Sequence, residues 1–141
     1  MTYQTSIVAS ALPKSASVAV LRCNDHFAMN PDPLARLFSD MPAAEAEDIV
    51  CRVLEDIAQR LDVLHDLRLS GAFADVQTPA RRVAAISLQI GLTTVATAAE
   101  HVACAASLRN GVALGATVAR LERAFDAAVS EVWDFRSYQE N

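Results

Sequence analysis

The sequence predicts an all-α protein, an antiparallel up-down four-helix bundle with a short extra helix in front of it. Hydrophobic residues make up 52% of the 141 residues, enough for the core of one domain. Much of this apolar share is Ala, the best helix former. The chain has only 4 Gly and 5 Pro, whereas an all-β domain of this size needs many more turn residues. Long helices joined by short connections pack as antiparallel neighbours, which favours the up-down bundle.

The first part of the chain lacks the pattern of the rest. Residues 1–30 show no helical period, so we expect an irregular N-terminal arm there and a helical bundle domain over residues 31–141. A short extended piece over residues 17–22 is the only strand content that we expect. The N-terminus has no charged start before an apolar stretch, as a signal peptide would have. No apolar run reaches the roughly 18 to 20 residues of a membrane helix. We therefore expect a cytoplasmic protein that does not bind a membrane.

The first two helices are marked by their ends. Asp32 as N-cap and Pro33 at the first helical position predict a short helix over residues 33–39. A long helix over residues 43–70 has acidic residues in its first turns, where they complement the helix dipole. Gly71 can adopt the left-handed conformation that ends such a helix. Its apolar stripe has spacings of three and four and consists of Ile49, Val50, Val53, Leu54, Ile57, Leu61 and Leu64.

The third helix is predicted to be continuous over about residues 79–108, after a connection over residues 72–77. Thr78 is its expected N-cap and Pro79 its first-turn proline. Gly91 interrupts the apolar side at a cost on the order of 1 kcal/mol relative to Ala. We therefore expect a packing reason for this glycine, most simply the close approach of a neighbouring helix. The apolar side consists of Val83, Ile86, Ile90, Leu92, Val95, Ala99 and Val102.

The last helix is predicted over about residues 112–136, after a stop formed by Asn110 and Gly111. The 3 cysteines are widely spaced and form no C-x-x-C pair, which argues against a disulfide framework or a zinc site. Cys51 and Cys104 fall within apolar helical patterns and are expected to be buried free thiols. The apolar side of the last helix consists of Leu114, Val118, Leu121, Phe125, Ala128, Val129 and Val132.

The charge and the polar residues exclude several classes of function. The net charge is -5, and without a Lys/Arg cluster the chain has no electrostatic footprint for nucleic acid. Cys23 and His26 form a C-x-x-H without a second ligand pair, so we expect no metal site. Glu100 and His101 are adjacent, so their side chains diverge by about 100° around a helix and cannot share one ion in the di-iron manner. No nucleophile–base pair or phosphate loop occurs. We expect no enzyme, no catalytic residues, no metal and no cofactor.

The order of helices resembles the histidine-phosphotransfer (HPt) domains of bacterial phosphorelays, from about Leu34 to Val132. The segment ARRVAAISLQIGLTTVATAAEHV is similar to the signature of that family, in which Ala-His is followed by Leu, Lys, Gly and two small residues, with an apolar-Gly pair later. Placing Gly91 on the later glycine puts an apolar residue on each core position of the family. These residues are Val83, Ile90, Leu92, Val95 and Val102.

The same alignment shows where this chain departs from the family. It puts Arg81 on the phosphorylatable histidine and Ala84 on the usual lysine, while Ala85 and Ser87 fall on small positions. A guanidinium is always protonated and is no nucleophile. It can pair in a bidentate manner with acidic groups of a receiver domain. The alternative is that Arg81 and Arg82 are ordinary solvated residues. His101 and His65 are further candidates for the phosphoacceptor, although neither has an adjacent Lys or a small-residue neighbourhood.

One stripe is a candidate partner-binding surface. Arg81, Ala84, Ala85 and Leu88 have the spacing i, i+3, i+4, i+7, so they share one helix face, with Arg82 beside it. In the family that the chain resembles, this stripe docks the receiver. Small residues next to an Arg and an exposed Leu suit a helix-mediated contact. The competing interpretation is that the stripe packs inside the bundle, against the N-terminal arm or a second copy.

Two functions therefore stay open. The resemblance implies a phosphorelay signalling protein, a non-phosphorylatable adaptor that binds a response-regulator receiver domain or a histidine kinase. The alternative is a structural or self-associating helical bundle, for instance a homodimer, without a signalling role. Receiver docking requires an exposed stripe, whereas a self-association module buries it symmetrically.

Overall fold

The computed structural model describes residues 27–140, and this part of the chain is all-helical, as predicted, without a β-strand. The expected extended piece over residues 17–22, Cys23, His26 and most of the expected arm lie outside the described residues. Five helices follow one another along the chain. They are α1 (Asp32–Asp40), α2 (Ala43–Ser70), α3 (Phe73–Gln89), α4 (Thr93–Ser107) and α5 (Gly111–Glu140).

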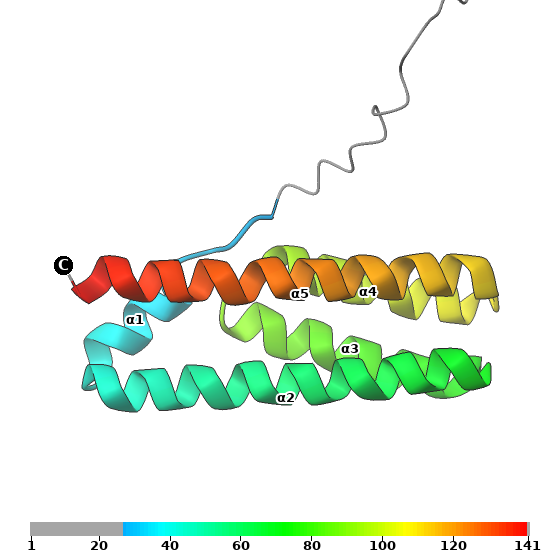
Figure 1. Ribbon diagram of the computed structural model, residues 1–141, viewed down its shortest axis with the longest axis horizontal. Coiled ribbons are helices and arrows are strands. Elements are labelled where there is room, and N and C mark those ends of the chain that lie inside the picture. The colour runs from blue at the N-terminus through cyan, green and yellow to red at the C-terminus, as the bar shows by residue number, and fades with distance from the viewer. Residues whose placement is uncertain (1–26, 141) are drawn as a thin grey trace, which may run out of the picture.

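The two long helices frame the molecule. α2 and α5 run along its whole length, while α3 and α4 form a hairpin over one half (Figure 1). α1 lies at the opposite end, near the start of α2 and the end of α5 (Figure 1). There Leu34 is buried, the Phe38 and Phe135 rings lie 6.3 Å apart between centroids, and Glu47 of α2 forms an ion pair with Arg136 of α5. The elements therefore surround one core.

The end of α2 is confirmed at the predicted residue. Gly71 is left-handed, with φ at 73°. Its N–H donates to the carbonyl of Arg68 at 3.2 Å, and the N–H of Ala72 donates to the carbonyl of Leu67 at 3.1 Å. These two bonds satisfy carbonyls that the end of a helix leaves unpaired, which is the Schellman arrangement.

The start predicted for the third helix is wrong. α3 begins at Phe73, so Pro79 lies inside the helix and Thr78 is not a cap. The expected connection over residues 72–77 is mostly helical. Val76 is fully buried and Phe73 packs against the core. Burial of these two side chains extends the helix back through the Thr-Pro pair, because tertiary packing outweighs local propensity.

The continuous helix predicted over residues 79–108 is also wrong, because the chain breaks at Gly91. Gly91 has a positive φ of 84°. Its N–H donates to the backbone carbonyl of Leu88 at 3.1 Å, and the N–H of Leu92 donates to the backbone carbonyl of Ser87 at 2.8 Å. α3 therefore ends in the same arrangement as α2. A close approach does explain this glycine, but from backbone rather than from a helix: a Cβ here would collide with the carbonyl oxygen of Asn30.

The segment before α1 is anchored at this break. The N–H of Asn30 donates to the carbonyl of Gly91 at 2.8 Å. Ala28 donates to the Thr94 hydroxyl at 2.6 Å and accepts from the Thr93 hydroxyl at 2.9 Å. The last residues of the expected arm, 27–30, are therefore held against the α3–α4 turn.

The helix start predicted near Asp32 is displaced by one residue. Pro31 is the N-cap and Asp32 is the first helical residue. Asp32 makes no side-chain cap; instead its N–H donates to Oδ1 of Asn30 at 3.1 Å.

The turn between α4 and α5 does not use its glycine as predicted. Arg109 adopts the left-handed conformation, with φ at 53°, and its N–H donates to Ala106 at 3.1 Å. Asn110 takes part in both helix ends. Its N–H donates to the carbonyl of Ala105 at 3.4 Å, and its Oδ1 caps α5 by accepting from the N–H of Ala113 at 3.0 Å. Gly111 is then the first residue of α5.

Two further observations concern surfaces. The expected burial of both helical cysteines is wrong, since Cys51 is half-buried and Cys104 is exposed. Cys104 lies on the outer side of α4 with Thr97 and Glu100, which are also exposed. None of the helices in residues 27–140 has the length and apolar character to cross a membrane.

Candidate partner-binding groove

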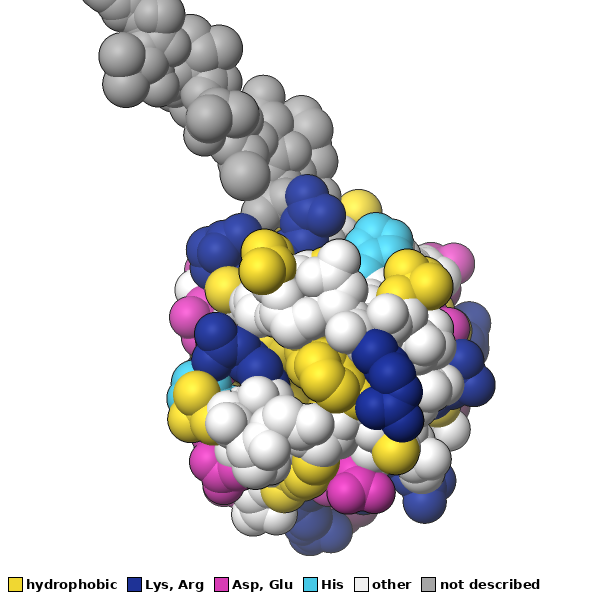
Figure 2. All heavy atoms as spheres, turned by 90° about the vertical axis from the view of Figure 1, so that its right-hand side faces the viewer, with side chains coloured by type: hydrophobic (Ala, Val, Ile, Leu, Met, Phe, Trp, Pro, Cys, Tyr) yellow, Lys and Arg dark blue, Asp and Glu magenta, His cyan; other side chains and the backbone are white. Residues whose placement is uncertain are grey.

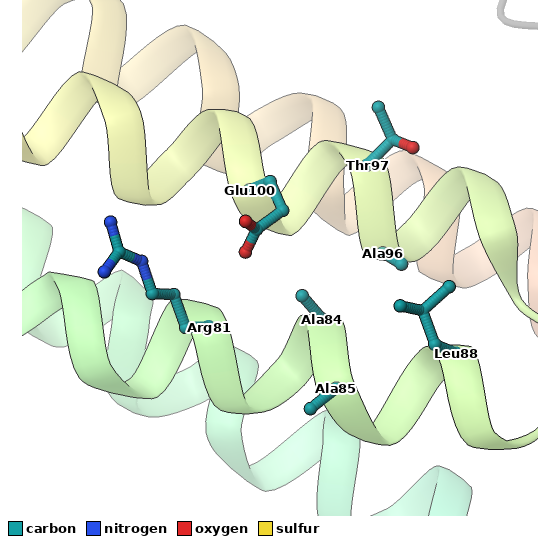
Figure 3. Close-up of a pocket in the computed structure, with 7 residues that line it drawn as sticks. All are labelled: Arg81, Ala84, Ala85, Leu88, Ala96, Thr97 and Glu100. Atoms are coloured by element: carbon teal, nitrogen blue, oxygen red, sulfur yellow. The ribbon is translucent and has the colours of Figure 1, made fainter.

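A groove lies between the two helices of the hairpin. It has a volume of about 350 Å³, and Figure 3 shows the side chains around it. α3 contributes the stripe predicted from the sequence, and α4 contributes the opposite wall. The lining residues are Arg81, Ala84, Ala85, Leu88, Ala96, Thr97 and Glu100.

Three of the four stripe residues are exposed and one is buried. Leu88 is 58% exposed, and Arg81 and Ala85 are exposed as well. Ala84 is only 5% exposed and belongs to the hydrophobic core. Arg82 is exposed but does not line the groove. The expectation that all four stripe residues share one accessible surface is therefore wrong for Ala84, whose methyl group forms part of the floor.

The stripe also lies elsewhere along its helix than the sequence predicts. With Pro79 as a first-turn residue, it would occupy the first three turns at one end of the bundle. Because α3 begins at Phe73, Arg81 is in the third turn and Leu88 lies next to the turn into α4. The groove therefore lies along the hairpin, between the middle of α3 and the turn into α4.

The α4 wall was missed by sequence reasoning. Ala96, Thr97 and Glu100 join the groove because α4 runs back along α3. In an antiparallel hairpin, opposite residues have numbers with a nearly constant sum, as residues 81 and 100 or 84 and 97 do. A tight turn at Gly91 would have revealed these pairs. The continuous helix predicted there concealed them.

One charge of each sign lies at the same end of the groove. Arg81 reaches from α3 towards α4, and the carboxylate of Glu100 points back towards α3 (Figure 3). Within residues 27–140 neither side chain forms an ion pair. Between them and Leu88 the lining consists of three alanines and Thr97. The groove therefore combines an apolar floor with two charges that are available to a partner.

The histidines lie away from this groove. His101 follows Glu100 on α4 and is exposed, but it does not line the groove. His65 of α2 lies beside Glu122 of α5, with 3.7 Å between Nδ1 and Oε2. Among the described residues, no group of His, Cys, Asp and Glu side chains is arranged to hold a metal ion.

A second apolar surface lies at the end of the molecule where α2 ends and α5 begins. Hydrophobic side chains gather near the middle of this end, with basic side chains around them (Figure 2). Three exposed residues carried by this end are Leu69, Leu108 and Val112, which are 66%, 72% and 86% exposed. We call these three residues the end patch. The sequence offered a signal for it, because large apolar residues flank both helix stops there.

Comparison of the chain with protein-family models, with curated proteins and with solved structures found no match.

Proposed function

We propose that this protein is an HPt-like adaptor, which binds a response-regulator receiver domain through the α3–α4 groove and does not transfer phosphate. A cytoplasmic location and contact with a histidine kinase belong to the same proposal. The observation that carries it is the groove itself, because the exposed Arg81 stands beside a floor of small residues at the position where the resembled family has its histidine.

The arrangement of the helices supports the fold part of this proposal. A short α1 precedes four longer helices, and the chain reverses between successive ones (Figure 1). The break at Gly91 coincides with the later glycine of the resembled signature. All five residues that the resemblance puts on core positions are at most 8% exposed, namely Val83, Ile90, Leu92, Val95 and Val102.

The chemistry of the groove supports the part without phosphotransfer. A phosphoacceptor needs an exposed nucleophile that reaches an aspartyl phosphate in line. Arg81 is exposed but always protonated. Its planar guanidinium instead suits a bidentate contact with a carboxylate of the receiver. The position that carries lysine in the family holds Ala84, which has no charge to balance a phosphoryl group.

The proposal is tested by titrating isolated receiver domains of the source organism into the full-length protein and measuring heat or fluorescence anisotropy. At least one receiver should bind, and Leu88→Asp should weaken that binding at least tenfold. Burial of a leucine is worth about 1.5 to 3 kcal/mol, and about 1.4 kcal/mol corresponds to one decade in Kd.

Leu69→Asp is the matched control, because Leu69 is 66% exposed but belongs to the end patch. It should leave receiver binding unchanged. Equal losses with both variants would remove the groove from the proposal, and a lack of binding by every receiver would reject the adaptor function.

A further inference from the structure

The α3–α4 groove is self-complementary. Its positive charge, Arg81, is on one helix and its negative charge, Glu100, is on the other, at the same height (Figure 3). The protruding Leu88, 58% exposed, lies on α3 towards the hairpin turn, and the small Ala96 lies on α4 at the same end of the groove. An isologous dimer needs such a surface, because each patch must match a copy of itself.

A two-fold axis along the groove satisfies both matches at once. Rotation about this axis puts α3 of one subunit over α4 of the other without moving either along the groove. Arg81 then faces Glu100 of the partner subunit, and Leu88 faces Ala96 of the partner subunit. Each contact occurs twice. The two hairpins together form a four-helix contact in which facing helices remain antiparallel.

We propose that two copies of this chain associate through the α3–α4 groove, with reciprocal Arg81–Glu100 ion pairs and with Leu88 packed on the alanines of the partner subunit. The two Arg81–Glu100 ion pairs determine how one subunit is oriented relative to the other. If the second copy were turned end for end, like charges would lie closer to each other than opposite charges do. Leu88 would then no longer face Ala96 of the partner subunit. The small floor lets the helices approach, as small residues do at close helix contacts.

The dimer covers the surface that the receiver would use, so the two states exclude each other. This competition rests on the proposed function, whereas the dimer itself does not. Because the groove is shorter than the bundle, we expect the dimer to bury an area at the low end of the range for protein–protein interfaces. Association through so small an interface is weak and depends on protein concentration. Self-association would then hold the adaptor inactive when it is abundant and its receiver is scarce.

Charge reversal provides the test, measured as the dimer Kd of the full-length chain by sedimentation velocity over a concentration series. Arg81→Glu and Glu100→Arg each turn both ion pairs into like-charge contacts, so each should raise the dimer Kd at least tenfold. The double variant carries both changes and restores opposite charges across the interface. Its dimer Kd should lie within about threefold of the wild-type value, a difference no larger than the variation in energy among surface ion pairs.

Mixing the two single variants gives an independent measurement. In a mixed dimer, the Arg81→Glu subunit has acidic residues at positions 81 and 100, and the Glu100→Arg subunit has basic residues at both. Both contacts between residue 81 and residue 100 therefore join opposite charges. Two proteins that are monomeric alone should therefore associate when combined. Circular dichroism melting curves of each variant check the fold, and Leu69→Asp, in the end patch, should dimerise as wild type does.

A wild-type chain that stays monomeric throughout the series would overturn the proposal. A double variant or a mixture that does not associate would also overturn it. Both rescues must occur if residue 81 of one subunit faces residue 100 of the other, and an interface elsewhere would give neither. Receiver binding gives a separate readout. The receiver is unchanged by these substitutions, so the double variant should not regain receiver affinity. Failure of the adaptor function would therefore appear as missing heterologous binding with the dimer intact.

Discussion

Arg81 decides at the scale of one residue what the groove can do. Its guanidinium is exposed on the surface of α3, where a histidine would be needed for phosphotransfer in the resembled family. Replacing a neutral imidazole by a guanidinium keeps a hydrogen-bond donor and adds a permanent positive charge, but it removes the nucleophilic lone pair. The same site is thereby suited to binding an acidic group and unsuited to accepting a phosphoryl group.

This difference predicts the outcome of a phosphotransfer assay. Incubated with a phosphorylated receiver that binds it, the wild-type protein should acquire no acid-labile label, whereas Arg81→His should acquire some, because the imidazole then stands over the small floor. Label on the wild-type protein that disappears in a His101→Ala variant would identify His101 as the acceptor and contradict the prediction. Arg82→His, exposed but outside the groove, is the matched control and should remain unlabelled.

Ser87 provides a second prediction at the residue scale. Its side chain is fully buried, and within residues 27–140 its hydroxyl oxygen has no hydrogen-bond partner. An unpaired buried hydroxyl costs on the order of 1 kcal/mol or more. Ser87→Ala should therefore raise the free energy of unfolding by about 1 kcal/mol, measured by urea denaturation. Ser107→Ala, which removes an exposed hydroxyl, should change it by less than about 0.5 kcal/mol. Destabilisation by Ser87→Ala would instead show that the hydroxyl is paired.

At the scale of the element, three helices end by the same arrangement. α2, α3 and α4 are each followed by a left-handed residue, Gly71, Gly91 and Arg109 respectively. In each case, the next residue donates its N–H to a carbonyl further back in the helix, at 3.1, 2.8 and 3.4 Å. Two of these ends use glycine, for which the left-handed conformation carries no steric cost. The third forces it on a residue with a Cβ, at about 1 to 2 kcal/mol.

Arg109→Gly should therefore stabilise the protein by about 1 kcal/mol, because it relieves this cost, less the greater flexibility of glycine in the unfolded chain. Thermal and urea denaturation measure the change. The same substitution inside a helix has the opposite sign: Arg52→Gly, exposed in the middle of α2, should destabilise by about 1 kcal/mol. If both variants lose stability, the α4–α5 turn does not strain Arg109.

The two glycine ends permit a comparison that separates strain from contact. Nothing lies within 4 Å of a Cβ placed on Gly71, whereas a Cβ on Gly91 would meet the carbonyl of Asn30. Gly71→Ala should cost about 1 kcal/mol through its positive φ alone. Gly91→Ala should cost at least about 1 kcal/mol more, because backbone atoms must move. Equal losses in urea denaturation would mean that the segment before α1 does not press on the hairpin turn.

The whole molecule decides which stripe residues are accessible. The hairpin packs along α2 and α5 over half their length (Figure 1), so Val83 and Ala84 turn into the core while Leu88 remains outside. α4 lies between neighbours and has eight of its 15 residues buried. Six of these are alanines, at positions 96, 98, 99, 103, 105 and 106, and the other two are Val95 and Val102. Short side chains on α4 let its neighbours approach closely.

Leu88→Asp tests this arrangement through global stability. A substitution at an exposed position usually changes the free energy of unfolding by less than about 0.5 kcal/mol. The melting temperature of the Leu88→Asp variant, measured at low protein concentration, should therefore stay near that of the wild type. Leu121→Asp, at a fully buried position of α5, should prevent folding or lower stability by several kcal/mol. A large loss from Leu88→Asp in a monomeric sample would place Leu88 in the core.

The sequence alone was sufficient for features that depend on a few neighbouring residues. The bounds of α2, its end at Gly71 and the buried apolar positions of α3, α4 and α5 follow from local propensity and from the helical period. On α3, the same period identified one wall of the groove, because residues three and four apart share a helix face whatever lies opposite.

Only the tertiary structure decided the features that depend on what lies opposite. Burial of Phe73 extended α3 past its proline, the backbone of Asn30 explains Gly91, and α4 brought Glu100 to the groove beside Arg81. Propensity signals act over about four residues along the chain. Burial and charge pairing, in contrast, are set by atoms that folding brings together from distant positions, so no local pattern specifies them.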